Sequence, residues 1–262
     1  MMVLENHSYS EVIGNPQMPN LNALAKQNVL LTKSYGVSHP SLPNYIALLS
    51  GSTQGITKDC KDCFVNQKSL PDLIEASGRT WKTYQEDMPS ACFVGDAKPY
   101  VQKHNPFIYF DPIRTNAARC NRSIVPLSTL DSDLAANQLP NLSFIMPNLC
   151  NSAHDCGLDV ADKWIGGMVS KLQASPALGK NYLIVVTFDE GEGKDAASFN
   201  SAGGAGGQVA TVLISPQAKT GFNDPTSVSH YGLLKTILLA WGLPDLGSTS
   251  QADVQPITAP WN

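Results

Sequence analysis

The sequence has no long hydrophobic run and no concentration of positive charge. Its longest apolar segments, NYLIVVTF and LLKTILLAWGL, fall short of the roughly 20 apolar residues that cross a bilayer. The 18 basic and 22 acidic residues are spread along the chain and give a net charge of -4. We therefore expect no integral membrane segment, and no nucleic acid partner, because no basic stripe could follow a phosphate backbone.

Internal repeats and low-complexity linkers are also absent. With 262 residues, 42% of them hydrophobic, the chain can bury a sizeable core and lies at the upper end of what one domain holds. We expect residues 1–262 to form a single domain. The start of the chain, MMVLEN, lies inside an apolar, strand-like piece without a signal peptide or room for a complete first strand, so we expect a trimmed N-terminus.

Cysteine is sparse, and its even count is informative. The pair at 60 and 63 lies in a polar loop without the flanking strand and helix of a thioredoxin-like motif. Metal binding by four cysteines is an alternative, but no second pair has the spacing of a zinc finger. We expect three disulfides and hence a secreted or periplasmic protein. Six cysteines allow 15 pairings, of which pairing between sequence neighbours is the simplest. The six are Cys60, Cys63, Cys92, Cys120, Cys150 and Cys156.

Segments of helical and of strand character alternate along the chain. Apolar residues recur at helical spacing in residues 19–27, 69–77, 159–175 and 230–243. Segments rich in β-forming residues lie at 28–37, 80–87, 142–147, 181–190 and 208–216. This alternation predicts the α/β class, with a mostly parallel central sheet and helices on both faces. Residues 88–140 lack a clear period, and we expect an insertion that passes over the edge where the strands end.

Polar side chains follow several of these strands. Glu5 and Asn6 come after the first apolar piece, Ser41 follows the second strand, and Asp189 and Glu190 end a buried strand. In α/β folds, ligands bind outside the carboxyl ends of the strands. Two acids at the end of a buried strand lose hydration unless a cation or strong donors meet them. A bound cation would satisfy both.

Each of these positions also has a purely structural interpretation. Asp189 and Glu190 would then form a solvated strand end, and Ser41 would cap an apolar helix that carries Pro43 in its first turn. A serine at a helix N-terminus, however, lies beside backbone N–H groups and the positive end of the helix dipole, where an anionic phosphate would be held. The convergence of several polar strand ends favours a functional site.

All five histidines lie in loops or at the starts of elements. A lone histidine is more often a surface or core group than a functional one, so their positions next to other polar candidates are what favours function. We favour His154 and His230 most. The five are His7, His39, His104, His154 and His230.

Six motifs, taken in order, carry a resemblance to a known family. They are ENHSYSEVIG, SHPSLPNYIALLSG, PNLCNSAHDCG, TFDEGEG, QVATVLISP and SHYGLLKTIL. From residue 4 to about residue 245 the chain resembles the bacterial phosphoesterase family of secreted acid phosphatases and phospholipases C, in the alkaline phosphatase superfamily. The resemblance implies an alkaline-phosphatase-like fold and metal-dependent hydrolysis of phosphate esters through a covalent intermediate.

The resemblance also implies roles for individual residues. Ser41 would be the nucleophile and would contact the metal, so that the intermediate is a phosphoserine. The segment SLPN is similar to the TFPN of nucleotide pyrophosphatases/phosphodiesterases, which implies that Asn44 holds a phosphoryl oxygen. The full metal-binding set implied is Glu5, Asn6, Ser41, Asp189 and Glu190.

Histidines complete the implied site. We expect His154 and His230 to contact the phosphoryl group or to protonate the leaving alkoxide, and a protonated histidine in that role predicts an acidic pH optimum. The residues expected to bind substrate are His39, Lys103, His104 and Asp155.

We expect one divalent metal ion. Two-metal members hold the second ion with an aspartate and two histidines, but Ser152 stands where relatives often carry the aspartate. The oxygen-only set of ligands suits Ca²⁺, Mg²⁺ or Mn²⁺, whereas the habit of the superfamily favours Zn²⁺, so the identity of the metal stays open.

These observations lead to a functional prediction. We expect an acid phosphatase that hydrolyses phosphomonoesters, acting on a small phosphorylated substrate or a phospholipid head group. One alternative is a phosphodiesterase of the phospholipase C type. Another is a secreted binding domain that kept the fold and lost catalysis, which the presence of Ser41, Asp189 and Glu190 argues against.

Overall fold

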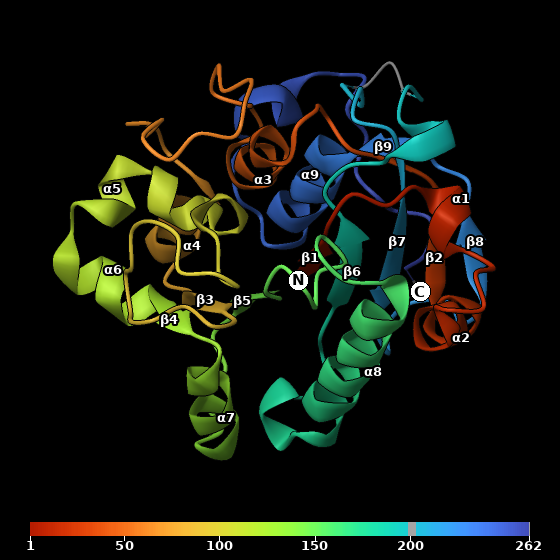
Figure 1. The fold of residues 1–262 in the computed structure, drawn as a ribbon, viewed down its shortest axis with the longest axis horizontal. Helices are drawn as coiled ribbons and strands as arrows, with labels where there is room; N and C mark the ends of the chain where they lie inside the picture. The colour runs from red at the N-terminus through yellow and green to blue at the C-terminus, as the bar shows by residue number, and fades with distance from the viewer. Residues whose placement is uncertain (199–202, 262) are drawn as a thin grey trace.

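The central sheet is built from the apolar segments that the sequence marks as strands. The computed structural model of the chain describes residues 1–198 and 203–261 (Figure 1). The strands of this sheet follow the order β1-β6-β7-β2-β8, and β9 also pairs with β2. Their bounds are β1 (Met2–Leu4), β2 (Val29–Tyr35), β6 (Ile184–Phe188), β7 (Gln208–Ile214), β8 (Phe222–Asp224) and β9 (Val228–Ser229).

Strand β7 runs against the direction of its neighbours. The pairs β1–β6, β2–β8 and β2–β9 are parallel, as expected, whereas β7 is antiparallel to both β2 and β6. A parallel connection needs a crossover of a dozen or more residues, usually a helix. Between β6 and β7 the described residues contain only the short 3₁₀ helix η4 (Gly193–Asp195), so the chain turns back and β7 runs antiparallel beside β6.

A second, fully parallel sheet extends the first. It has the order β4-β3-β5, with β3 (Trp81–Gln85), β4 (Ile124–Pro126) and β5 (Leu142–Met146). The backbone N–H of Ile145 donates to the carbonyl of Met1 at 2.8 Å, so β5 lies alongside the start of β1. The α/β class is confirmed, with strands divided between two hydrogen-bonded sheets instead of one.

Helices cover both faces of the central sheet. On one face, α3 (Ser41–Ser50) packs against α9 (His230–Ala240), and on the other α2 (Pro19–Gln27) packs against α8 (Leu158–Ala174). The side chains of β1 alternate between the two cores: Val3 belongs to the core under α3 and α9, and Met2 and Leu4 to the core under α2 and α8. Figure 1 shows the strands between these two helix pairs.

The aperiodic segment 88–140 folds into short elements. Its first 3₁₀ helix, η1 (Gln102–His104), packs against α3 and brings two of the predicted site residues to the end of that helix. The remaining elements of the segment are η2 (Pro106–Tyr109), α5 (Asp111–Arg114), α6 (Ala117–Ser123), β4 and α7 (Ser128–Ala135). Elsewhere lie α1 (Tyr9–Val12), α4 (Leu70–Ala76), η3 (Pro176–Leu178) and η5 (Gly247–Ser250). Among the described residues, none of the helices has the length and apolar character to cross a bilayer.

Three disulfides join sequence neighbours, as expected. Cys60 pairs with Cys63, Cys92 with Cys120, and Cys150 with Cys156. The first closes a loop beside η1, and the third closes the loop after β5 that carries His154. Neighbour pairing, the simplest of the possible patterns, is confirmed.

The disulfides close loops of different length, so they should contribute unequally to stability. Cys60 and Cys63 are 3 residues apart, whereas Cys92 and Cys120 are 28 apart. Because closing a longer loop restricts the unfolded chain more, replacing this pair with serines should lower the free energy of unfolding by about 3–4 kcal/mol, against about 2 kcal/mol for Cys60–Cys63. Urea unfolding of the two double variants measures the difference. The unfolded, non-reduced wild type should show no reactive thiol, and a titration that finds six would refute the disulfide framework.

Candidate active site

The hydroxyl of Ser41 lies between two buried carboxylates. Ser41 is the first residue of α3, and its Oγ is within hydrogen-bond distance of Oε2 of Glu5 at 2.9 Å and of Oε1 of Glu190 at 3.1 Å. All three side chains are buried. A hydroxyl has one proton and donates to one acceptor at a time. One of the two carboxylates must therefore carry a proton, or a cation must lie between them.

The pairing of β1 with β6 brings the acidic side chains together. Leu4 and Phe188 are partners in this parallel pair, so the residues that follow them, Glu5 and Asp189, emerge at the same sheet edge. The backbone N–H of Asn6, a residue with φ of 56°, donates to Oδ1 of Asp189 at 3.0 Å. The other oxygen, Oδ2, is buried and has no hydrogen-bond partner among the described residues. A carboxylate oxygen in that state is available to a cation.

The three carboxylates shift one another's protonation. Burial, together with the charges of Glu5 and Glu190, raises the pKa of Asp189 well above its usual value. Burial also raises the pKa of Glu190 to about 7, although His39 opposes the shift. Burial acts on Glu5 in the same direction, but the charge and hydrogen bond of His104, with Lys103 and Tyr45, lower its pKa to about 2. Without a cation, the cluster holds protons near neutral pH.

Tyr45 is a site residue that the sequence analysis missed. It lies four residues after Ser41, on the same face of α3, and its hydroxyl donates to Oε1 of Glu5. The ring of His104 stacks on Tyr45 at 5.6 Å between centroids, and Nε2 of His104 lies 3.0 Å from Oε1 of Glu5. The sequence feature that could have identified Tyr45 is its spacing of four residues from Ser41, which places both side chains on one face of a helix. Its apolar surroundings made the tyrosine resemble an ordinary core residue.

The amide of Asn44 holds the turn before α3. Its Oδ1 accepts from the backbone N–H groups of Val37 (2.7 Å) and Ser38 (3.1 Å). Its Nδ2 donates to the carbonyls of Ser38 (2.8 Å) and Pro40 (3.3 Å). Both donors and both acceptor positions are thus used, and none is left for a phosphoryl oxygen. In this structure Asn44 fixes the turn that presents Ser41, and its contact with a phosphoryl oxygen stays a prediction.

Two glycines let the chain pass close to this turn. Gly36 and Gly206 pair through their backbones, with the N–H of Gly206 donating to the carbonyl of Gly36 at 2.9 Å. A Cβ atom on Gly206 would lie 2.4 Å from the carbonyl oxygen of Ser38, and one on Gly36 would lie 2.8 Å from that of Asp189. Only glycine permits this approach.

His39 and the loop after β5 lie beside the carboxylates. Nδ1 of His39 pairs with Oε2 of Glu190, and its Nε2 lies 3.0 Å from the carbonyl of Ala196. In the loop, Nδ1 of His154 lies 2.7 Å from Oδ1 of Asp155. Its Nε2 lies 3.4 Å from Nζ of Lys103.

His230 does not have the position of a proton donor to substrate. It is buried at the start of α9, and its Nε2 donates to the backbone carbonyl of Asp189 at 2.5 Å. Burial lowers the pKa of His230 to about 4, although the hydrogen bond to Asp189 raises it. At mildly acidic pH the ring is therefore neutral, and its one N–H is already in use. In this geometry His230 supports the end of β6, and its role as a proton donor stays a prediction.

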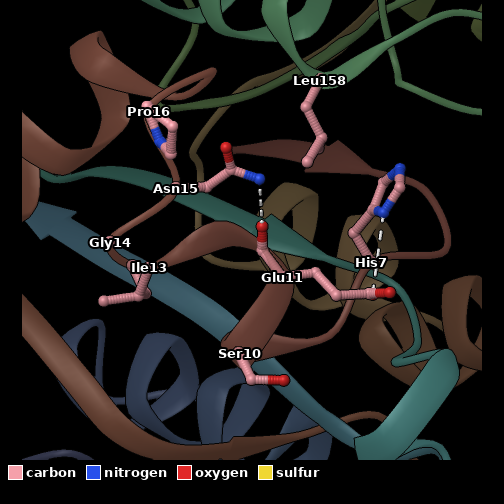
Figure 2. Close-up of a pocket in the computed structure, with 8 residues that line it drawn as sticks. All are labelled: His7, Ser10, Glu11, Ile13, Gly14, Asn15, Pro16 and Leu158. Atoms are coloured by element: carbon pink, nitrogen blue, oxygen red, sulfur yellow. Dashed lines mark hydrogen bonds and ion pairs between the residues drawn. The ribbon is translucent and has the colours of Figure 1, made fainter.

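His7 lies in a separate surface hollow. Figure 2 shows its ring pointing toward Glu11, and Asn15 and Leu158 also line the hollow. Nδ1 of His7 lies 3.8 Å from Oε2 of Glu11, and Nδ2 of Asn15 donates to the carbonyl of Glu11 at 2.7 Å. These groups pair with one another and do not converge on the carboxylate cluster.

Two sets of side chains could hold a metal ion. Glu5, His104 and His154 offer ligand atoms that lie within 4.8 Å of one another. The ammonium of Lys103 next to His154 opposes a cation there. The oxygens around Ser41 fit a cation better, because they include the unpartnered Oδ2 of Asp189 and carry surplus negative charge.

Comparison with known sequences places the chain in a family. The sequence model of the Phosphoesterase family matches residues 7–244. A phosphate-repressible acid phosphatase of Penicillium chrysogenum is 36% identical over 238 residues, which is 87% of this chain and 55% of the fungal protein. A phosphatidylinositol-3-phosphatase of Mycobacterium tuberculosis is 33% identical over 265 residues, covering 100% of this chain and 81% of that protein. The chain spans about half the length of the fungal relative.

Solved structures show the same fold. A protein of the alkaline phosphatase superfamily from Vibrio parahaemolyticus superposes with a TM-score of 0.63 at 13% identity, covering 94% of this chain and 67% of the other. The resemblance carried by the six sequence motifs is confirmed. With a family match that extends over most of its length, the chain belongs to the Phosphoesterase family, and its fold is that of the alkaline phosphatase superfamily.

Proposed function

We propose that this protein is an acid phosphatase that hydrolyses phosphomonoesters through a phosphoserine on Ser41. The observation that carries the proposal is the hydroxyl of Ser41, held at a helix N-terminus within hydrogen-bond distance of the buried carboxylates of Glu5 and Glu190. A carboxylate beside a serine hydroxyl can take its proton, and the helix N-terminus favours an anion. Together these are the requirements for attack on phosphorus.

One divalent cation would complete the site. Its ligands would be Glu5, Asp189, Glu190 and Ser41, with Asn6 as the fifth, and the buried, unpartnered Oδ2 of Asp189 supports this set. Bound there, the cation would lower the pKa of the serine hydroxyl and offset the charge of the phosphoryl group. The all-oxygen set suits Mg²⁺, Ca²⁺ or Mn²⁺, and Zn²⁺ stays an alternative.

In the first step, the side chains of this cluster transfer a proton and form a bond. Oγ of Ser41 attacks phosphorus while its proton passes to the carboxylate of Glu190, whose Oε1 lies 3.1 Å away. The bond from phosphorus to the leaving oxygen breaks. A protonated His154 gives its Nε2 proton to that oxygen, and the bond from its Nδ1 to Asp155 fixes the ring.

In the second step, water hydrolyses the phosphoserine. The water oxygen forms a bond with phosphorus and the water gives one proton to His154, which restores its protonated form. The bond between phosphorus and Oγ breaks, Glu190 returns its proton to Ser41, and inorganic phosphate leaves. His39, whose Nδ1 pairs with Glu190, keeps that carboxylate oriented through both steps. Lys103 supplies positive charge near Glu5 on the side where substrate would bind, and His104 lies 3.0 Å from Glu5.

The relatives favour monoesters over diesters. Acid phosphatases are among the more similar proteins, at 36% identity for the Penicillium enzyme, whereas a phospholipase C of Mycobacterium tuberculosis is 24% identical over 231 residues. The name of the mycobacterial phosphatidylinositol-3-phosphatase adds phosphoinositide head groups to the candidate monoesters. The three disulfides support a secreted or periplasmic location. A phospholipase C-like diesterase is the second candidate.

Replacing the nucleophile tests the covalent step. Ser41→Ala should reduce hydrolysis of an aryl phosphate by at least about 10³-fold, because no other hydroxyl is proposed to form the intermediate. Ser50→Ala, on the same helix and also buried, is the matched control and should keep activity. Acid quenching during turnover should trap labelled phosphate on Ser41. Label on any other residue would refute the assignment.

Replacing Asp189 tests the metal site. Asp189→Asn should remove the bound metal together with the activity, because it takes negative charge from a site built of oxygens. Metal content by mass spectrometry is the readout. The exposed Asp159→Asn, which only breaks the surface pair with Lys163, should keep full occupancy. A fully occupied Asp189→Asn protein would show that the metal binds elsewhere.

The raised pKa of Glu190 predicts how the metal-free protein responds to pH. An acid whose folded pKa is raised, here from 4.5 to about 7, contributes stability below 4.5 that is lost as the pH rises to about 7. Asp189 acts in the same direction, whereas the lowered pKa of Glu5 acts only below its usual value. In chelator, these two carboxyl groups should therefore make the melting temperature fall from pH 4.5 to 7, against the opposite contribution of the buried His230 and the Met1 amino group, whose pKa values are lowered.

The controls for this titration are a variant and a metal. Relative to wild type, Glu190→Gln should raise the melting temperature more at pH 7 than at pH 4.5, while Glu192→Gln, an exposed side chain two residues on, should leave the pH dependence unchanged. Adding a divalent metal should stabilise the protein more at pH 7 than at pH 5, because protons compete for the same oxygens. A metal effect independent of pH would contradict the carboxylate site.

A further inference from the structure

One carboxylate outside the proposed ligand set touches two parts of the site. Oδ1 of Asp59 accepts from the backbone N–H of Leu42, the residue after Ser41, at 3.0 Å. Oδ2 of Asp59 accepts from Nζ of Lys103 at 2.9 Å. A single side chain therefore joins the first turn of α3 to the 3₁₀ helix η1. Neither interaction is visible in the sequence, because 17 residues separate Asp59 from Leu42 and 44 separate it from Lys103.

The loop that carries Asp59 is fastened to the same region. Its next residue, Cys60, forms the disulfide with Cys63, and the carbonyl of Cys60 accepts from the hydroxyl of Tyr109 at 2.7 Å. The carbonyl of Lys61 accepts from Nε2 of Gln102, the buried neighbour of Lys103, at 2.8 Å. Asp59 is thus presented from a braced loop, and its position relative to η1 is fixed by more than its own ion pair.

The buried carboxylates of the site compete with Asp59 for the ammonium of Lys103. Burial opposes the charge of Lys103, but the carboxylate of Glu5, followed by Asp59 and Asp189, raises the pKa of Lys103 overall. A lysine carries its ammonium on a flexible four-carbon stem. Without Asp59, the attraction of the buried carboxylates would draw that ammonium toward the oxygens around Ser41. With Asp59 in place, Nζ lies 3.4 Å from Nε2 of His154.

We propose that Asp59 is a positioning residue of the active site. Its carboxylate holds the ammonium of Lys103 beside His154, where it can meet an incoming phosphate, and keeps it away from the carboxylates of the metal site. It also anchors the turn that presents Ser41. This proposal rests on the proposed function, since it takes the bound anion to be the phosphoryl group of the substrate.

A double-mutant cycle on phosphate binding tests the role. Asp59→Asn retains an oxygen for the Leu42 N–H but removes the charge that holds Lys103. In the metal-loaded protein it should weaken binding of inorganic phosphate by about tenfold, as should Lys103→Met. In the Lys103→Met background, Asp59→Asn should then change the affinity by less than about twofold, because the two residues act as one unit. Calorimetry gives the affinities, and kcat/KM for an aryl phosphate should follow them.

The control is an ion pair in the same loop. Lys61→Met breaks the pair with Asp96, at 2.6 Å, and should leave phosphate affinity within about twofold of wild type. Comparing the melting temperatures of Asp59→Asn and Lys61→Met separates a loss of stability from a loss of positioning.

Each of the remaining outcomes would contradict the positioning role of Asp59, the proposed function, or both. If the losses from Asp59→Asn and Lys103→Met are additive, Asp59 does not act through Lys103 and the proposal is wrong. Tighter phosphate binding by Asp59→Asn would also overturn it, because Asp59 would then be occupying the anion site. A wild type that binds phosphate with a coupled cycle, yet hydrolyses no ester, would refute the proposed function alone. A wild type that does not bind phosphate would refute both.

Discussion

The structure depends on a cluster of buried carboxylates that the protein alone does not neutralise. Glu5, Asp189 and Glu190 surround one hydroxyl that can donate to a single acceptor, and the second oxygen of Asp189 has no partner among the described residues. Burying like charges together is costly unless protons or a cation reduce the repulsion. The same feature that lowers stability near neutral pH is therefore the one that creates affinity for a divalent metal.

The fold concentrates these groups by simple means. Parallel pairing of β1 with β6 places Glu5 and Asp189 at one edge, and the turn held by Asn44 places Ser41 above them. The segment between β3 and β4 contributes η1, which places the ammonium of Lys103 and the ring of His104 next to the acidic cluster. Strand ends thus supply the acids, a helix end supplies the hydroxyl, and an irregular segment supplies the balancing charge.

Sequence reasoning succeeded where the signal was local. An apolar strand ending in two acids, or a serine before an apolar helix, is visible within ten residues, and the structure brings Ser41 and Glu190 into contact. It failed where a role depends on distant partners. The sequence did not show that His230 contacts the carbonyl of Asp189, 41 residues away, and so supports the strand end. The antiparallel direction of β7 was deducible, since no helix was predicted between it and β6, but strand alternation alone suggested a parallel sheet.

The position of the metal is the most direct test of this account. Crystals of the protein loaded with Mn²⁺ or Zn²⁺ should give one strong anomalous difference peak, about 2.0–2.4 Å from Oδ2 of Asp189 and from Oγ of Ser41. Oxygens of Glu5 or Glu190 should complete the shell. A peak bound instead by Glu5, His104 and His154, with Oδ2 of Asp189 still without a partner, would contradict the central claim that the buried carboxylates around Ser41 form the metal site.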